Sequence, residues 1–586
     1  MEVRKRVNHE NVNNIKEEYG KHTDILYYNK CNIEKVEKLK RVNEIRKDSM
    51  NKITHFFICS KVLLLILFVI PIAMIIYFIL LFNSINQNDI FYLKQIIKSS
   101  LTKIDPKDLV IKSIHENMDN ILLDKNRQNI HIIAFGKAAF SMIIGAENEL
   151  GRYVSSSIAS IPCDVKIPKV ANLKTVFFKG GKNNLPDKDS LEATNQINNF
   201  INNIPKDDVV LILISGGGSA LLPAPIPGVT LEEKFNITKL VAANSADIRQ
   251  LNIVRQSLST MKGGQLVEKL YPRKVISLIL SDIVGDPVQY IASGPTYISE
   301  SIEGESRRIG RYQEAISVLK ELNLFTNISS HILEAMKMYA YDKDNIEDKT
   351  ILNDGRIQNY IIGNNMKGLQ ILRDNLMSLP YDYCIDDVTI VTDSLEGNVE
   401  VLAKNYCIVI KKFLGYGEID LSFINSTIKP YKIKPNQTKI GFLFGGEWVI
   451  KLNKNNKNGI GGRNQHLVLE VLSNLINQIH NCSVLDKRNF KLLSFNTDGF
   501  DGPTLAAGAM IDGEDLVYFL SRNSSDDYKE IVNDDFTKLN ITTYLDNRNS
   551  FEFWEKYKNS RNHIVTGRTN TNFMDITILI LEILNN

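Results

Sequence analysis

A glycine-rich loop after an apolar run is the first feature of this chain that could do chemistry. Residues 209–214 read VVLILI, and Ser215, Gly216, Gly217, Gly218 and Ser219 follow directly. The apolar run predicts a buried strand. The glycines let backbone N–H groups face outward and let a ligand approach the main chain. We therefore expect a loop that binds phosphate or carboxylate, although a tight turn without a ligand fits the same residues.

A second group of candidate residues is cationic. Asn252, Arg255, Ser259 and Lys262 recur at a spacing that places them near one face of a helix. Such a stripe could bind phosphate or carboxylate, and a solvated helix face is the alternative interpretation of this segment.

Carboxylates flank the next predicted strand end. Asp282 and Asp286 stand on either side of Gly285. Paired carboxylates can hold Mg²⁺ or accept a proton, while the structural alternative is turn capping. Asp498 and Asp501 offer two more carboxylates in the tight loop TDGFDGPT.

An arginine completes the candidate set. Arg463 follows two glycines at the start of a stretch that predicts a helix. At this position its guanidinium could stabilise charge on a transferring phosphoryl group.

These residues require a scaffold that brings loops together. Five apolar runs end in a polar or glycine loop, which predicts strands at residues 130–134, 209–214, 274–280, 439–444 and 491–495. In open α/β sheets, ligands bind outside the carboxyl ends of the strands. We expect an α/β body whose site is built by these loops, with a domain junction in the less patterned region 300–435.

Composition excludes some classes of protein. The chain has 586 residues, enough for more than one domain, and a formal net charge of only +3, so nothing favours nucleic-acid binding. None of the six cysteines falls into a C-x-x-C pair or a metal-ligand spacing, which favours reduced thiols.

The N-terminal region differs from the rest. Residues 1–61 are polar and predict an extension. Residues 62–82 are uncharged and apolar throughout, which predicts a single transmembrane helix and hence a single-pass membrane protein. A buried helix is the alternative. Lys and Arg before residue 62 weakly favour a cytosolic N-terminus. An ATP-dependent reaction would instead require the large domain to face an ATP-containing compartment such as the cytoplasm, so the membrane side stays open.

Seven motifs in order give a specific resemblance. They are GKAA (136–139), SGGGSALLPAPIP (215–227), LNIVRQSLSTMKGG (251–264), LSDIVGDP…IASGPT (280–296), GGE (445–447), GGRNQ (461–465) and TDGFDGPT (497–504). From about residue 90 onward, the chain resembles the class II glycerate kinases of the MOFRL family, and the animal form most of all.

The resemblance implies transfer of the γ-phosphoryl group of ATP to the 2-hydroxyl of D-glycerate, with Mg²⁺, in a cleft between two Rossmann-like α/β domains. We expect these domains at residues 88–340 and 350–586. The family's catalytic positions match Lys137, Asp282 and Arg463, and Asp282 and Asp286 are the expected metal ligands. The residues expected to bind the cofactor are Ser215, Gly216, Gly217, Gly218, Ser219, Asn252, Arg255, Lys262, Gly446, Glu447, Asn464, Gln465, Asp498 and Asp501.

Several positions depart from the family pattern. Leu505, His466, Gln250 and Asn549 stand where acidic residues are usual, and TGRTNTNFMD carries Arg568 for proline and Asn570 for glycine. The leading hypothesis is a membrane-anchored glycerate 2-kinase. The alternative is a catalytically impaired, membrane-anchored relative that acts as a binding protein.

Other enzyme classes lack their motifs here. An oxidoreductase acting on hydroxypyruvate is disfavoured, because no G-x-G-x-x-G fingerprint follows any predicted strand. Neither a Walker A motif nor the protein-kinase H-R-D and D-F-G motifs are present.

Overall fold

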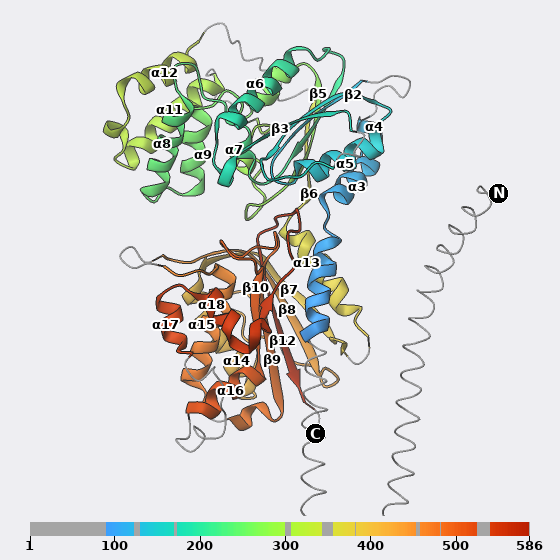
Figure 1. The fold of residues 1–586 in the computed structure, drawn as a ribbon, viewed down its shortest axis with the longest axis vertical. Helices are drawn as coiled ribbons and strands as arrows, with labels where there is room; N and C mark the ends of the chain where they lie inside the picture. Colours follow the sequence, from blue (N-terminus) through green and yellow to red (C-terminus); the bar gives the residue numbers. More distant parts are fainter. Residues whose placement is uncertain are drawn as a thin grey trace, which may run out of the picture. The chain divides into compact units, whose positions relative to one another are not determined.

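Two six-stranded sheets organise the protein (Figure 1). The computed structural model describes residues 90–121, 129–168, 173–298, 306–342, 355–380, 383–452, 458–480, 482–523 and 539–584. Both sheets lie in the compact unit formed by residues 92–586.

The first sheet is entirely parallel, with the strand order β3-β2-β1-β4-β5-β6. Its strands are β1 (Ile130–Phe135), β2 (Val154–Pro162), β3 (Thr175–Gly180), β4 (Val209–Ile214), β5 (Lys274–Leu280) and β6 (Ile357–Gly363). The central strands β1 and β4 are buried along their whole length. This burial explains why β4 is a continuous apolar run, and β1 a run interrupted only by His131, instead of alternating patterns.

The second sheet is mixed, with the order β11-β10-β9-β12-β8-β7. Its strands are β7 (Asp387–Asn398), β8 (Lys439–Val449), β9 (Arg488–Asn496), β10 (Gly508–Asp512), β11 (His563–Ile564) and β12 (Asp575–Ile583). Only β7 and β8 pair in parallel, and every other pair is antiparallel. The predicted Rossmann-like form of the second domain is therefore wrong. β12 inserts between β8 and β9 by long-range pairing, which no local pattern reveals.

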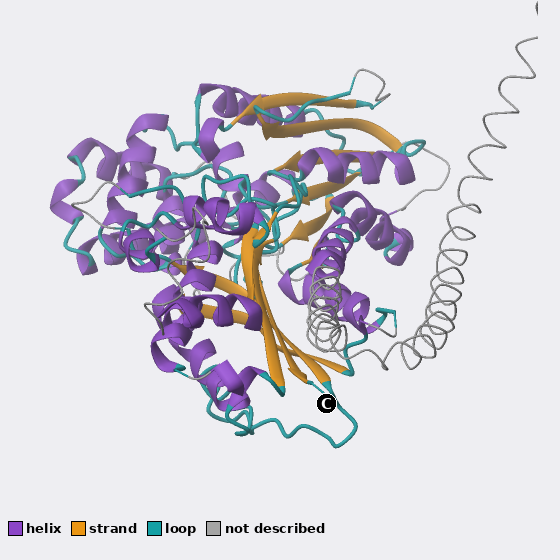
Figure 2. Ribbon diagram, turned by 60° about the horizontal axis from the view of Figure 1, so that its bottom comes forward, coloured by secondary structure: helices purple, strands orange, loops and turns teal. Residues whose placement is uncertain are grey.

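Helices accompany both sheets (Figure 2). The longer ones are α3 (Pro106–Glu116), α5 (Ala139–Leu150), α6 (Lys188–Asn202), α8 (Leu231–Ala243), α9 (Ile248–Ser257), α11 (Arg307–Glu321), α12 (Ser330–Ala340), α13 (Asn365–Met377), α14 (Val399–Leu414), α15 (Arg463–Gln478) and α16 (Gly513–Asn523). Shorter ones are α4 (Met118–Ile121), α7 (Gly218–Leu221), α10 (Gln265–Leu270), α17 (Ile541–Asp546) and α18 (Ser550–Lys556).

The helices α8, α9, α11 and α12 gather beside the first sheet (Figure 1) and share an apolar core of their own. A second core fills the space between α14, α15 and the second sheet, around Tyr406, Trp448 and Phe490. All five strands expected from the sequence are present as β1, β4, β5, β8 and β9.

The chain passes from the first sheet to the second after β6, which pairs with β5. Closer to the N-terminus, two residues contact Asn375 of α13. The Asn375 amide donates a hydrogen bond to the Ser100 hydroxyl and accepts one from Lys103 Nζ. The domain limits 88–340 and 350–586 stay a prediction.

The predicted transmembrane helix and single-pass membrane location require correction. Among the described residues, no helix combines the length and the apolar composition that are needed to cross a membrane. Residues 62–82 and the extension 1–61 lie outside the described residues. The prediction rested on local hydropathy alone, and the described residues give no support for the membrane as a partner.

Candidate active site

The loops after β1 and β4 meet at the point where the strand order of the first sheet reverses. β1 and β4 are adjacent, and the connections run outward from this pair in opposite directions, a position where α/β proteins bind ligands. The Lys137 backbone N–H donates to the Gly216 carbonyl at 2.8 Å, and the Ala138 N–H donates to the Ser215 hydroxyl at 3.0 Å. Tertiary pairing thus places Lys137 against the glycine loop.

Two glycines of this loop allow functional side chains to approach closely. A Cβ on Gly216 would lie 2.2 Å from Oδ2 of Asp282, which follows the neighbouring strand β5. A Cβ on Gly217 would lie 3.0 Å from Cγ of Lys137, and Gly217 has a φ of +77°. The glycines therefore leave room for Lys137 and Asp282 as well as permitting the turn.

Asp282 has the electrostatic properties of a proton acceptor. Desolvation raises the pKa of Asp282 to about 6, while Lys137 opposes this shift and Glu447 adds to it. A general base works best when its pKa lies near the working pH. Glu447 belongs to the second sheet and Lys137 follows a strand of the first, so charges carried by both sheets affect the pKa of Asp282.

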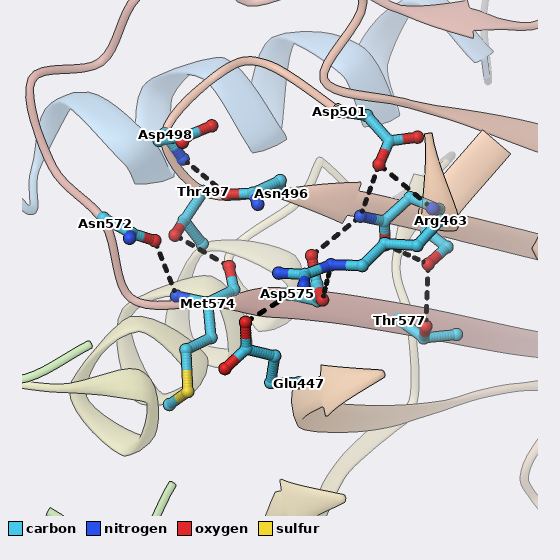
Figure 3. A network of polar contacts seen from close by, with 12 residues as sticks. Glu447, Arg463, Asn496, Thr497, Asp498, Asp501, Asn572, Met574, Asp575 and Thr577 are labelled. Atoms are coloured by element: carbon cyan, nitrogen blue, oxygen red, sulfur yellow. Dashed lines mark hydrogen bonds and ion pairs between the residues drawn. The ribbon is translucent and has the colours of Figure 1, made fainter. Parts of the chain in front are cut away.

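Arg463 lies between two carboxylates (Figure 3). Its Nε is 2.6 Å from Oδ2 of Asp575, and its Nη1 is 3.0 Å from Oε1 of Glu447. Arg463 is the first residue of α15, as the sequence predicted. The guanidinium remains partly exposed and lines the cavity described below.

Asp575 is a residue of the site that the sequence analysis missed. It is fully buried, and its place in β12 pairs it with Gly446 of β8 and Asn496 of β9. Burial raises the pKa of Asp575, and the charge of Arg463 opposes this shift. The available signal was an aspartate at the start of the apolar run 576–581. Its partner could not be inferred without the sheet order.

The amide residues after Arg463 serve a buried network. Asp501 accepts hydrogen bonds from the backbone N–H groups of Asn464 (3.1 Å) and Gln465 (2.8 Å), and so caps the start of α15. Asn464 Nδ2 also donates to Asp575 Oδ1 at 2.7 Å. Asp501, Asn464 and Gln465 are at most 1 % exposed, and none of them lines the cavity. The network fixes the start of α15 and the Asp575 carboxylate, and both of these position Arg463.

A cavity of about 960 Å³ is lined by Lys137, the start of the glycine loop and Arg463, whereas Asp282 and Glu447 are not among its lining residues. Its volume lies at the upper end of the range that is usual for small-molecule sites, about 300–1,000 Å³. The predicted residues that line it are Lys137, Ser215, Gly216, Arg463 and Asp498. Burial raises the pKa of Asp498, while Lys137, Arg463 and Arg568 oppose the shift.

Other predicted residues lie elsewhere. Gly446 is needed for strand packing, because a Cβ there would lie 2.0 Å from the Leu395 carbonyl. Gly218 packs against Ala292, and the Ser219 hydroxyl lies 3.0 Å from that of Ser293.

The cationic stripe is not one helix face. α9 ends at Ser257, so Lys262 lies in the loop that follows and not on the helix that carries Asn252 and Arg255. None of Asn252, Arg255 and Lys262 lines the cavity.

The second expected metal ligand is already bonded. Asp286 accepts a hydrogen bond from Asn364. In the described part of the chain, Glu400, His466 and Glu470 are the one group of three potential ligands. Arg548 occupies that group, donating to Glu400 and lying 2.9 Å from His466 Nε2. A guanidinium there leaves no need for a metal ion.

Comparison with known proteins agrees with this geometry. Residues 92–337 match the domain of unknown function DUF4147, and residues 440–575 match the MOFRL family. A mouse protein named glycerate kinase is 32% identical over 486 residues, which cover 78% of this chain and 85% of the mouse protein. The chain belongs to the glycerate kinase family.

More distant members of the glycerate kinase family also align. The D-glycerate 2-kinase of Thermotoga maritima is 28% identical, over 83% of this chain and 96% of its own. A crystal structure described as a glycerate kinase from the same organism superposes with a TM-score of 0.61 at 25% identity, covering 84% of this chain and 98% of the other.

Proposed function

We propose that this protein is a glycerate kinase that transfers the γ-phosphoryl group of ATP to the 2-hydroxyl of D-glycerate, giving 2-phosphoglycerate. The observation that carries this proposal is the placement of Lys137 and Arg463 on one cavity, with Asp282 against the glycine loop that lines it. The names of the mouse and Thermotoga relatives support the substrate.

The roles follow from charge and position. Asp282 accepts the proton of the 2-hydroxyl as that oxygen bonds to the γ-phosphorus and the bond to the β–γ bridging oxygen breaks. Lys137 neutralises a phosphate or the substrate carboxylate, and Arg463 opposes the charge that develops on the transferring group. Phosphoryl transfer depends mainly on positioning and electrostatic stabilisation, which these three residues supply.

The carboxylates near these cations fit a magnesium ion. Asp282 is electrostatically coupled to Glu447 and Lys137, and Asp498 is coupled to Lys137 and Arg463. Carboxylate oxygens are suitable Mg²⁺ ligands, so Asp282 with Asp498 or Glu447 would hold the ion. When bound, Mg²⁺ supplies positive charge to the nucleotide phosphates. Asp286 would join only by releasing Asn364.

Two of the departures from the family pattern, Gln250 and Asn570, fit their surroundings. Gln250 completes a capping box with Asp247 at the start of α9, as an acidic residue would. Asn570 has a φ of +59°, a conformation that asparagine tolerates better than most residues. Leu505 is 74% exposed. The impaired binding protein stays the alternative, and it predicts ligand binding without turnover.

The test is a phosphorylation assay of the full chain with ATP, Mg²⁺ and D-glycerate that resolves 2- from 3-phosphoglycerate. We expect the 2-isomer. Lys137→Met and Arg463→Ala should each lower kcat by roughly 10²–10³-fold, whereas Lys188→Met, on the exposed face of α6, should not. A folded protein that binds ATP without product would favour the alternative.

A further inference from the structure

The cavity wall carries a cation, Arg568, at a position where the family pattern has proline. Arg568 lies between β11 and β12 of the second sheet, and its Nη1 atom is 2.5 Å from Oδ2 of Asp164. Asp164 follows β2 of the first sheet and lines the same cavity. This ion pair therefore joins loops of the two sheets along the wall of the candidate active site.

The partner of Arg568 is easily exchanged. The side chains of Arg568 and Asp164 are 44% and 58% exposed, and an ion pair between exposed side chains is weak because water screens both charges. A guanidinium binds a phosphate more strongly, since two parallel N–H groups can donate to two of its oxygens. A phosphate that enters the cavity would therefore displace the Asp164 carboxylate.

The charges on the cavity wall favour an anionic ligand. Among the described residues that line the cavity, four side chains are cationic and two are carboxylates. The cations are Lys137, Lys182, Arg463 and Arg568, and the carboxylates are Asp164 and Asp498. This excess of positive charge suits a polyanion such as a nucleotide triphosphate.

The loop that carries Arg568 packs against the loop that carries Asp498. The Thr569 backbone N–H donates to the Asp498 carbonyl at 3.3 Å, and a Cβ on Gly499 would lie 2.0 Å from the Gly567 carbonyl oxygen. Arg568 is also one of the cations that oppose the rise in the pKa of Asp498. Since Asp498 is a proposed ligand of Mg²⁺, Arg568 lies beside the place where the phosphates of a magnesium nucleotide would bind.

We propose that Arg568 is a nucleotide-binding residue that the family pattern lacks, and that it releases Asp164 to bind a phosphate of ATP. The assignment to the nucleotide rests on the proposed function, in which Asp498 faces the magnesium ion. Asp164 competes with the ligand, because it holds the guanidinium while the nucleotide is absent. Two substitutions should consequently have opposite effects: loss of Arg568 weakens nucleotide binding, and loss of the Asp164 charge strengthens it.

The test uses the full chain and measures binding separately from turnover. The variants are Arg568→Met, which removes the charge at a similar side-chain length, Arg568→Lys, Asp164→Asn and the double variant Asp164→Asn/Arg568→Met. The matched controls are Arg373→Met and Asp374→Asn. Arg373 of α13 is 48% exposed and pairs with Asp374 at 3.5 Å, and neither residue lines the cavity. Calorimetry with Mg²⁺ would measure the affinity for a non-hydrolysable ATP analogue and for D-glycerate.

We expect Arg568→Met to bind the ATP analogue roughly 10-fold more weakly and Asp164→Asn to bind it about 2- to 5-fold more tightly. The gain from Asp164→Asn should vanish in the double variant, because it acts through the freed guanidinium. Arg568→Lys should retain part of the affinity, since an ammonium group keeps the charge but not the planar pair of donors. The affinity for D-glycerate and both controls should match the wild type.

Equal weakening by Arg568→Met and Asp164→Asn would overturn the proposal, because the ion pair would then serve only to join the two loops. A gain that persists in the double variant would contradict it as well, since the charge of Asp164 would act on the ligand without Arg568. Loss confined to D-glycerate would refute the assignment to a phosphate.

The same measurements separate this inference from the proposed function. If D-glycerate is not phosphorylated, yet Arg568→Met weakens binding of the analogue and the controls do not, the nucleotide site stands and the proposed function fails. An active kinase in which Arg568→Met leaves the affinity for the analogue unchanged would give the opposite result.

Discussion

Nε of Arg463 lies 2.6 Å from Oδ2 of Asp575, and this carboxylate is fully buried at the start of β12. The contact joins the first residue of α15 to a strand that lies between β8 and β9. The other side of the guanidinium contacts Glu447, which is more exposed than Asp575. Of the two carboxylates that hold Arg463, Asp575 is therefore the one fixed by burial. Asp575 is thus a positioning residue for Arg463.

Asp575→Asn should lower kcat while preserving the fold. Asparagine keeps an acceptor for Asn464 Nδ2 but removes the charge that orients Arg463. A misplaced catalytic group costs on the order of 10²-fold in rate. Steady-state kinetics of Asp575→Asn, Arg463→Ala and the double variant would measure this effect.

The double variant should be little worse than Arg463→Ala, because both changes act through the same guanidinium. Glu582→Gln is the matched control, since Glu582 lies at the far end of the same strand and pairs with Lys439. Fully additive losses in the double variant would show that Asp575 acts independently of Arg463.

Gly216→Ala should impair catalysis through Asp282. The added Cβ would lie 2.2 Å from Oδ2 of that carboxylate, so Asp282 must move. Because the φ of Gly216 lies outside the positive range, alanine is tolerated by the backbone, and the loss should appear mainly in kcat, on the order of 10²-fold.

The control for this substitution is Gly310→Ala in α11. A Cβ there meets nothing within 4 Å, and alanine in a helix stabilises by roughly 0.5–1 kcal/mol relative to glycine. Wild-type turnover by Gly216→Ala would remove Asp282 from the proposed mechanism.

Asn570→Gly should leave turnover and stability nearly unchanged. The family pattern has glycine here, and Asn570 adopts a φ of +59° on the cavity wall. Asn570→Val should instead destabilise the protein by about 1–2 kcal/mol, because a β-branched residue is strained in this conformation. Urea unfolding together with the kinase assay measures both. A large gain of activity in Asn570→Gly would mean that this departure impairs the natural enzyme.

The free energy of unfolding should fall as the pH drops from about 6.5 to about 4. Burial, aided by the charge of Lys94, lowers the pKa of His563 from 6.5 to about 4. The unfolded chain therefore binds this proton first as the pH falls, and stability is fully present only above the unfolded pKa. The contribution of His563 is on the order of 2–3 kcal/mol.

Denaturant unfolding at a series of pH values would measure this slope. His563→Gln should flatten the slope, whereas His480→Gln, which removes an exposed histidine, should leave it as it is. An unaltered slope in His563→Gln would assign the pH dependence to other groups.

Much of the fold and part of the site followed from local patterns. The strands at residues 209–214 and 274–280 could be predicted from the sequence, because strands of a buried parallel sheet are mostly apolar along their length. The helix after Gly462 begins where the sequence placed it. The transmembrane prediction relied on local composition in the same way and has no support from the structure, because no helix in the described ranges could cross a membrane and residues 62–82 lie outside those ranges.

The sequence by itself determined which groups this protein can use: a lysine after β1, a glycine loop after β4, an aspartate after β5 and an arginine at the start of α15. Only the tertiary structure decided which of them meet. The register of β12 against β8 and β9 pairs Asp575 with Arg463, and the pairing of β1 with β4 places Lys137 against the glycine loop. Strand order and helix packing depend on contacts between residues that are distant in the chain. Periodicity and spacing report only the local backbone and the face that it buries.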